Sequence, residues 1–303
     1  MADISRAEVA TLIQEGYSNV LLDEAAKGST ALQAFPTVSM GTKTTHMPVL
    51  ATLPEASWVT ESAAASEGVK PTSQVTWSDL TLVAEELAVI VPIHENVVDD
   101  ATEAVLTEIA TWGGQAIGKA LDAAVFFGTN KPSSWASPAL VPAAVAASQS
   151  MAAVDGVANG SDLVGAANQV AAMIALAGHV PSTMISSLAL KYRVSNLRDA
   201  NGLPIFRDES FGGFTTWFNE NGAWNAATAE MIIVDSSRVR IGVRQDITVK
   251  YLDQATVNGI NLAERDMVAL RFKARYAYVL GIGATHMGSA KVPVGVVTPD
   301  VTS

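Results

Sequence analysis

The chain has 303 residues, of which 49% are hydrophobic and 16% are charged, and its formal net charge is −11. This composition excludes an intrinsically disordered chain and predicts a substantial buried core. The sequence contains no cysteine, which excludes disulfides, thiolate catalysis and cysteine-based metal sites.

The negative charge is concentrated in the first half of the chain. Residues 1–150 hold 17 Asp and Glu against 6 Lys and Arg, whereas residues 151–303 hold 13 of each kind. Tight phosphate binding requires clustered Lys and Arg, so this chain is a poor candidate for gripping nucleic acid. Two interpretations of the acids stay open: a surface that faces nucleic acid without binding it tightly, or the solubility of an apolar protein.

Residues 1–35 contain a helical pattern that breaks at Gly28 and Ser29, and we expect a short helix or arm before the main body. The mean hydropathy of +0.26 is high, but no run approaches the roughly 20 consecutive apolar residues of a membrane span. The surplus of apolar residues is explained either by a tight core or by apolar surface buried between subunits.

Residues 46–128 are the most informative segment, and their first part, residues 46–93, is a ribbon of two extended stretches joined by a tip. Trp58 precedes the tip, Trp77 follows it, and the returning stretch runs from Val75 to Ile93. The tip, residues 62–73, is rich in Ala, Ser and Gly, a composition typical of mobile loops. The ribbon is too long and too polar in its middle to be a core hairpin. We therefore expect it to lie on another copy of the protein.

A long helix is predicted over residues 99–128. Acidic residues at its start favour a helix N-terminus through the helix dipole, and apolar residues spaced by three and four mark one buried stripe. The pair Gly113-Gly114 interrupts its middle, and Gly128 ends it. Glycine in a helix interior costs roughly 0.5–1 kcal/mol relative to alanine, so the pair indicates a bend or a close approach.

Shorter patterns predict the remaining elements. The final strand alternates Arg and Lys with apolar residues, so we expect it to have one solvent-exposed face and to pack with the long helix. The aromatic-rich stretch 206–224 stays unassigned. The elements are a helix capped by Ser161 and running through Ala177, a buried strand at Met184-Ile185, a helix from Ser187 to about Arg198, and strands at Met231–Val234, Val239–Val243, Ile247–Leu252 and Met267–Leu280.

Several of these segments, taken in order, match one known family. The chain resembles the major capsid proteins of tailed bacteriophages with the Hong Kong 97-type fold. The resemblance covers nearly the whole chain and rests on the ordered set, since no single piece is specific. Its segments are Trp58-Val59 with Glu61 before the tip, the stretch Leu80–Val91 leading to His94–Asp100, Ala120-Leu121-Asp122 with Gly128 at the helix end, and the closing strand Met267–Leu280.

The resemblance implies an α+β fold with the Hong Kong 97-type division of the chain. An axial domain is inserted into a peripheral domain that is made of both termini. The implied parts are an N-terminal arm (1–35), the first part of the peripheral domain (36–154) with an extended E-loop hairpin (46–93) and a long spine helix (99–128), the axial domain (155–250), and peripheral return strands with the C-terminus (251–303).

The resemblance also implies partners and a location. Such proteins self-assemble as pentamers and hexamers into an icosahedral shell that encloses double-stranded DNA without sequence-specific binding. Because only 35 residues precede the body, a separate scaffolding protein is implied, together with a portal and, as an option, a decoration protein. The location is the virion capsid, assembled in the cytoplasm of the bacterial host, with no membrane partner.

No constellation of catalytic, cofactor-binding or metal-binding residues is recognisable, so we expect a structural protein that is not an enzyme and has no cofactor. The four histidines are scattered, and no pair has metal-ligand spacing. Two alternatives stay open: an encapsulin-like nanocompartment shell that encloses a cargo enzyme, and an enzyme with no recognisable motif. The histidines are His46, His94, His179 and His286.

The residues expected to contact a neighbouring subunit are Trp58, Glu61, Lys70 and Trp77. Gly113 and Gly114 are candidates for a hinge at which the spine helix bends as a precursor shell expands. In some family members an E-loop Lys is joined to an Asn of another subunit by an isopeptide bond. Lys70 lies on the corresponding loop, but no matching Asn is assigned, and a salt bridge or a solvated Lys is the alternative.

The two interpretations of Lys70 predict different results for denatured mature particles on electrophoresis. A crosslink would give bands at multiples of the 31.6 kDa subunit, because the isopeptide bond survives denaturation. A band at the subunit mass alone would exclude the crosslink.

Overall fold

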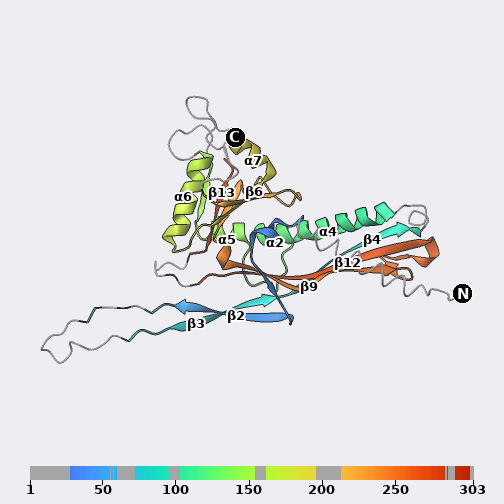
Figure 1. Cartoon of the computed structure of the whole chain (residues 1–303), viewed down its shortest axis with the longest axis horizontal. Coiled ribbons are helices and arrows are strands. Elements are labelled where there is room, and N and C mark those ends of the chain that lie inside the picture. The colour runs from blue at the N-terminus through green and yellow to red at the C-terminus, as the bar shows by residue number, and fades with distance from the viewer. Residues whose placement is uncertain are drawn as a thin grey trace.

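The structure, a computed structural model, describes residues 28–54, 56, 58–59, 72–95, 103–153, 162–195, 213–283, 285 and 291–300. Within these ranges the chain forms a four-stranded sheet, a five-stranded sheet and a long hairpin that projects from the body (Figure 1). Helices accompany both sheets. The predicted α+β class is confirmed.

The four-stranded sheet forms the body of the molecule. β12 lies inside it and pairs antiparallel with both β9 and β4, while β1 adds to β9 in parallel. The bounds predicted for the strand at Met267–Leu280 are confirmed. In spatial order the strands are β1 (Thr37–Ser39), β9 (Val239–Leu252), β12 (Met267–Leu280) and β4 (Glu85–His94).

Two predictions about this sheet are wrong in part. The strands predicted at Val239–Val243 and Ile247–Leu252 are one strand, because β9 keeps pairing with β12 on both sides of its polar middle and absorbs it as irregularities around Arg275. The solvent-exposed face predicted for β12 is confined to its first part, since residues 276–280 are buried on both faces.

The long helix α4 (Glu103–Phe126) lies across one face of the body sheet (Figure 1). Its apolar stripe, which includes Ile117 and Leu121, packs in one core cluster with Phe272 of β12. The predicted packing of the final strand with the long helix is thus confirmed. Gly128 follows the helix with a φ of +76°, a left-handed conformation that suits glycine after a helix C-terminus. The predicted helix start at residue 99 lies outside the described residues.

The five-stranded sheet mixes parallel and antiparallel pairs. Apolar side chains of α6 (Leu163–Leu176) cover one of its faces, and those of α5 (Leu140–Ala146) pack against the other. β8 confirms the strand predicted at Met231–Val234. In spatial order the strands are β5 (Ser150–Ala152), β13 (Val294–Thr298), β8 (Met231–Val234), β6 (Thr183–Ser187) and β7 (Thr215–Asn219).

Two helix starts near this sheet differ from prediction. The helix expected after Ser161 is capped by Asp162 instead, whose carboxylate accepts a hydrogen bond from the backbone N–H of Gly165 at 2.8 Å. The helix expected from Ser187 is α7 (Leu188–Ser195), which starts one residue later because Ser187 still pairs with β7.

The sheets depart from the predicted division of the chain at two strands. β9 begins at Val239, inside the range 155–250 expected for the inserted domain, yet it belongs to the body sheet. β13 falls in the range 251–303 expected to return to the body, yet it lies within the five-stranded sheet. The reason is the burial of both faces of β13: Val296 is fully buried on the side of α5, and Val297 is fully buried on the side of α6.

The projecting hairpin consists of β2 (Thr44–Thr52) and β3 (Thr76–Val83). The returning stretch predicted as a single arm over Val75–Ile93 divides at Ala84, where the chain leaves the hairpin and continues into β4 of the body sheet. Ala84 is fully buried, and its N–H donates to the carbonyl of Lys43 at 2.8 Å. The predicted E-loop range 46–93 therefore combines a projecting hairpin with a body strand.

Small elements complete the described chain. None of the helices in the described ranges is long and apolar enough to cross a membrane. Of the predicted N-terminal arm, residues 1–27 lie outside the described residues. The remaining elements are helix α2 (Thr30–Ala34), the short 3-10 helices η1 (Ser236–Arg238) and η2 (Ala263–Arg265), and the small hairpin of β10 (Thr256–Val257) and β11 (Ile260–Asn261).

Gly113 allows α4 to approach β12 closely. A Cβ added at this position would lie 2.9 Å from Cδ2 and Cε2 of Phe272, closer than van der Waals contact allows. Phe272 is fully buried within the core between the helix and the sheet, so its ring has little freedom to move. Close approach therefore explains why glycine stands at position 113.

We expect Gly113→Ala to lower the stability of the folded subunit. Alanine gains up to about 1 kcal/mol in helix propensity, but overpacking a buried ring costs typically ~1–3 kcal/mol. Thermal unfolding of the isolated subunit measures the net effect, which we expect to be a fall in Tm of a few degrees.

Gly41→Ala is the matched control, because no atom lies within 4 Å of a Cβ added there. An unchanged Tm for Gly113→Ala would contradict the packing role and favour the hinge interpretation.

Candidate functional site

The hairpin exposes two tryptophans along its length. Trp77 lies on β3 and is 67% exposed, and Trp58 lies beyond the end of β2 and is 100% exposed. The hairpin itself projects away from the body (Figure 1). Val59 and Val75 beside the two tryptophans are exposed as well. Neighbouring large apolar side chains at the surface mark an interaction site in a soluble protein, so the hairpin is the leading candidate for binding a partner.

The root of the hairpin is fixed to the body. Leu82 and Ala84 pack against Ala277 and Val279 of β12, on the sheet face opposite α4. The indole N–H of Trp135 donates to the carbonyl of Val83 at 3.0 Å. A firm root with a projecting arm is an arrangement that can transmit binding at the arm to the body.

One polar pair links the strands of the hairpin, and a second lies just beyond the root, between residues that flank these strands. Nδ1 of His46 on β2 lies 2.5 Å from Oδ2 of Asp79 on β3, and the ammonium of Lys43 lies 3.7 Å from the carboxylate of Glu85. These groups are exposed or partly exposed, so each pair contributes little to stability. In the described residues, His46 thus has a structural partner, and no group of three or more His, Asp or Glu could hold a metal ion.

Asp122 on α4 is a fully buried carboxylate that five donors satisfy. Burial raises its pKa from the ordinary value, while the hydrogen bonds act in the opposite direction. The donors come from the start of α2 and from the end of β7 with the following turn. Oδ1 accepts from Ser29 Oγ (2.7 Å) and Ala31 N (3.0 Å), and Oδ2 accepts from Thr30 N (2.9 Å), Asn219 Nδ2 (3.0 Å) and Asn221 Nδ2 (2.7 Å).

This carboxylate fastens three parts of the fold at one point. It joins α4 to the chain that enters at Gly28 and to the edge strand β7 of the five-stranded sheet. The contact is tight, since a Cβ added at Gly118 of α4 would lie 2.9 Å from the carbonyl carbon of Gly28. The sequence analysis did not predict this role. The one indication in the sequence is that Asp122 is a single charged residue within the apolar run that ends α4.

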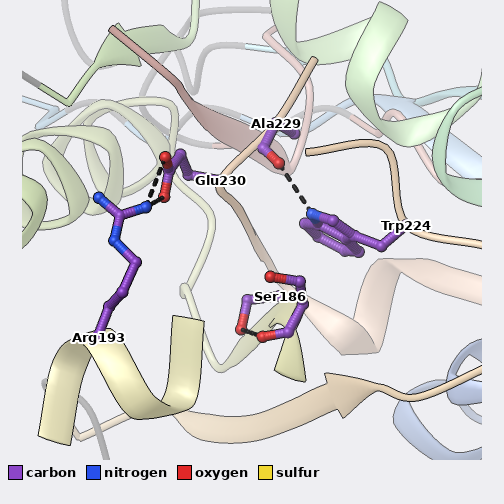
Figure 2. A network of polar contacts seen from close by, with 6 residues as sticks. Ser186, Arg193, Trp224, Ala229 and Glu230 are labelled. Carbon is purple, nitrogen blue, oxygen red and sulfur yellow. Dashed lines mark hydrogen bonds and ion pairs between the residues drawn. The ribbon is translucent and has the colours of Figure 1, made fainter. Parts of the chain in front are cut away.

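Part of the unassigned stretch 206–224 has a defined place in the core. Phe126 ends α4 and Phe127 follows it. Their ring centroids lie 6.1 and 5.5 Å, respectively, from the ring centroid of Trp224. The indole N–H of Trp224 donates to the carbonyl of Ala229 at 2.9 Å. Figure 2 shows this contact close to the ion pair between Arg193 of α7 and Glu230, with oxygen–nitrogen distances of 2.6 and 2.8 Å.

The predicted site residues lie in different parts of the chain. Trp58 and Trp77 are on the hairpin, whereas Glu61 and Lys70 lie outside the described residues. The glycines expected as a hinge, Gly113 and Gly114, are buried in α4. The structure therefore brings two of the four expected contact residues onto one exposed element.

Comparisons with known proteins give one consistent family. A sequence model described as the Phage capsid family matches residues 11–281. A solved chain from Mycobacterium phage Cain is 68% identical with a TM-score of 0.85, and 100% of each chain is covered. One from Microbacterium phage Oxtober96 is 40% identical with a TM-score of 0.80, covering 90% of this chain and 91% of that one.

A more distant structure, described as the capsid of a native GTA particle, is 15% identical with a TM-score of 0.59. It covers 89% of this chain and 90% of its own, and at this identity the likeness concerns the fold alone. No curated protein matches the chain.

We expect Asp122→Asn to destabilise the subunit by about 2–4 kcal/mol, since the new amide places its own donors against donors that the carboxylate now satisfies. Chemical denaturation of the isolated subunit measures this change as a lower midpoint.

Asp253→Asn, at an exposed position, is the control for loss of a negative charge and should leave the midpoint unchanged. Equal midpoints for the two variants would show that Asp122 does not fasten the fold.

Proposed function

The chain belongs to the phage capsid family and is a structural major capsid protein of a tailed bacteriophage, and from this premise we propose that its hairpin joins neighbouring copies into the shell. The observation that carries the proposal is the exposure of Trp58 and Trp77 on an arm that leaves its own body. Tryptophan is enriched among the residues that dominate protein interfaces.

The elements divide naturally into the roles of a Hong Kong 97-type subunit. The hairpin of β2 and β3 serves as the E-loop, α4 as the spine helix and the body sheet as the peripheral domain. The five-stranded sheet, with β13 included, serves as the axial domain that points to the centre of each capsomer. Residues 1–35 serve as the N-terminal arm. Pentamers and hexamers of such subunits then close an icosahedral shell.

Weak contacts are sufficient for such a shell. Burying about 200 Å² of one tryptophan contributes roughly 5 kcal/mol before the cost of ordering the arm is subtracted. Closed symmetry repeats this contact around each ring and between rings. Because the chain has no cysteine, disulfides cannot join the subunits. The shell is then held together by non-covalent contacts between subunits, unless Lys70 forms an isopeptide bond.

The partners follow from the same role. We propose a separate scaffolding protein during assembly, a portal, and double-stranded DNA held inside without sequence-specific contacts, with a decoration protein as an option. Assembly takes place in the host cytoplasm and the product is the virion capsid. The encapsulin-like alternative is not favoured, because the matching family and the similar solved chains come from phages.

The hinge at Gly113 and Gly114 stays a proposal with a narrower basis. The close contact with Phe272 explains the glycine at position 113 without any movement of the helix. A hinge role would add a change in the bend of α4 between a precursor shell and an expanded one.

Deleting residues 61–73 should leave foldable subunits that fail to form stable shells, because the arm loses the length needed to reach a neighbour. The double variant Trp58→Ala/Trp77→Ala should weaken assembly in the same direction, since it removes the apolar anchors. Negative-stain microscopy counts closed particles, and circular dichroism of the subunits checks folding.

Trp112→Ala serves as the matched control, because Trp112 is an exposed tryptophan on α4 and not on the hairpin. Wild-type-like particles from the deletion variant would overturn the proposed role of the arm.

A further inference from the structure

Asparagine is followed by glycine at four places in the chain. An asparagine before glycine is chemically labile, because glycine has no Cβ to shield the backbone nitrogen that lies next to the side-chain amide. The structure describes two of these pairs, Asn221-Gly222 and Asn258-Gly259, and their surroundings are opposite. The other two pairs, Asn159-Gly160 and Asn201-Gly202, lie outside the described residues.

Asn258-Gly259 forms the turn between β10 and β11. Asn258 has a φ of +50° and Gly259 a φ of +79°, positive values that a two-residue type I′ turn requires. Both residues are exposed, and no atom lies within 4 Å of a Cβ added at Gly259. Within the described ranges, no hydrogen bond holds the side-chain amide of Asn258, and the N–H of Gly259 has no backbone partner. Both reacting groups are therefore free.

The hairpin that carries this turn has little support. β10 and β11 pair through two residues each, and they form a sheet of their own that joins neither of the larger sheets. An isolated two-stranded hairpin is marginally stable at best in water, so the turn opens at low cost. Opening frees the backbone angles of Asn258, and its Cγ can then approach the nitrogen of Gly259.

Asn221-Gly222 is held in place instead. The side-chain nitrogen of Asn221 donates to Oδ2 of Asp122 at 2.7 Å and to the carbonyl of Gly28, and its side-chain oxygen accepts from the N–H of Ala223 at 3.0 Å. These bonds must break before Cγ of Asn221 can turn towards the nitrogen of Gly222. The buried carboxylate of Asp122 thus protects this pair from reaction.

We propose that Asn258-Gly259 is a site of self-modification, at which Asn258 of the folded subunit converts to aspartate or isoaspartate. The nitrogen of Gly259 loses its proton to water and attacks Cγ of Asn258, so that a C–N bond forms. The bond from Cγ to the amide nitrogen breaks, and this nitrogen takes up a proton and leaves as ammonia. Water then opens the cyclic imide at one of its two carbonyls. Water is the only co-reactant, and nothing is oxidised or reduced.

The reaction changes the turn in two ways. Each event adds one negative charge to a chain whose net charge is already −11. Isoaspartate also lengthens the backbone by one carbon, which disturbs the two-residue turn and its match to the flanking strands. The modified fraction grows with time, so the turn records the age of the folded subunit, whereas the protected Asn221 keeps the Asp122 cluster intact.

Peptide mass spectrometry of the full-length subunit, aged at mildly alkaline pH, tests the site. Trypsin cuts after Lys and Arg and releases the two pairs in separate peptides, residues 251–265 and residues 208–238. Fragmentation locates the mass gain that accompanies replacement of an amide NH2 by OH. We expect the modified fraction at Asn258 to exceed that at Asn221 at least about tenfold, because hydrogen bonds that must break first add to the barrier.

The denatured chain is the matched control, since both asparagines are then free and both precede glycine. In denaturant the modified fractions at Asn258 and Asn221 should become similar. The variant Asn258→Gln should remove the mass gain from residues 251–265, because the longer side chain would have to close a larger ring.

An unmodified Asn258 in the aged subunit, or equal modification of Asn258 and Asn221 in the folded chain, would overturn the proposal. A preference for Asn258 that persists unchanged in denaturant would overturn it as well, since the local sequence and not the fold would then select the site. A mass gain that remains in residues 251–265 of Asn258→Gln would assign the reaction to another amide, with the same consequence.

Discussion

Burial of β12 on both faces is the constraint on which the other parts depend. Its residues 276–280 contact the core under α4 on one side and the hairpin root on the other. A strand buried in this way positions the long helix and the projecting hairpin relative to each other through a single element. Core interiors are close-packed and deform little, so the subunit offers its arm in a defined direction.

The sequence predicted the long, strongly patterned elements well. Alternation identified β12 with its observed bounds, and the apolar stripe identified α4 and its packing partner. It failed where a decision depended on contacts distant in the chain. Nothing local separates Val75–Val83 from Glu85–Ile93, since both mix polar residues with Val and Leu. The burial of Ala84 marks where the projecting hairpin strand ends and the body strand begins.

The contact residues show the same limit. The exposure of Trp58 and Trp77 was predictable from the ribbon pattern, and their contact with a neighbouring subunit stays a prediction. The Asp122 cluster required the fold as well, since its donors lie about 90 residues or more away along the chain.

The Asp122 cluster has a mechanical consequence for a subunit held under tension in a shell. The chain that enters at Gly28 is gripped by hydrogen bonds to one rigid helix within four residues. Any pull on the preceding segment is therefore delivered directly to α4 and, through Asn219, to the edge of the five-stranded sheet. Load is thereby shared between α4, which packs on the body sheet, and the five-stranded sheet at a single joint.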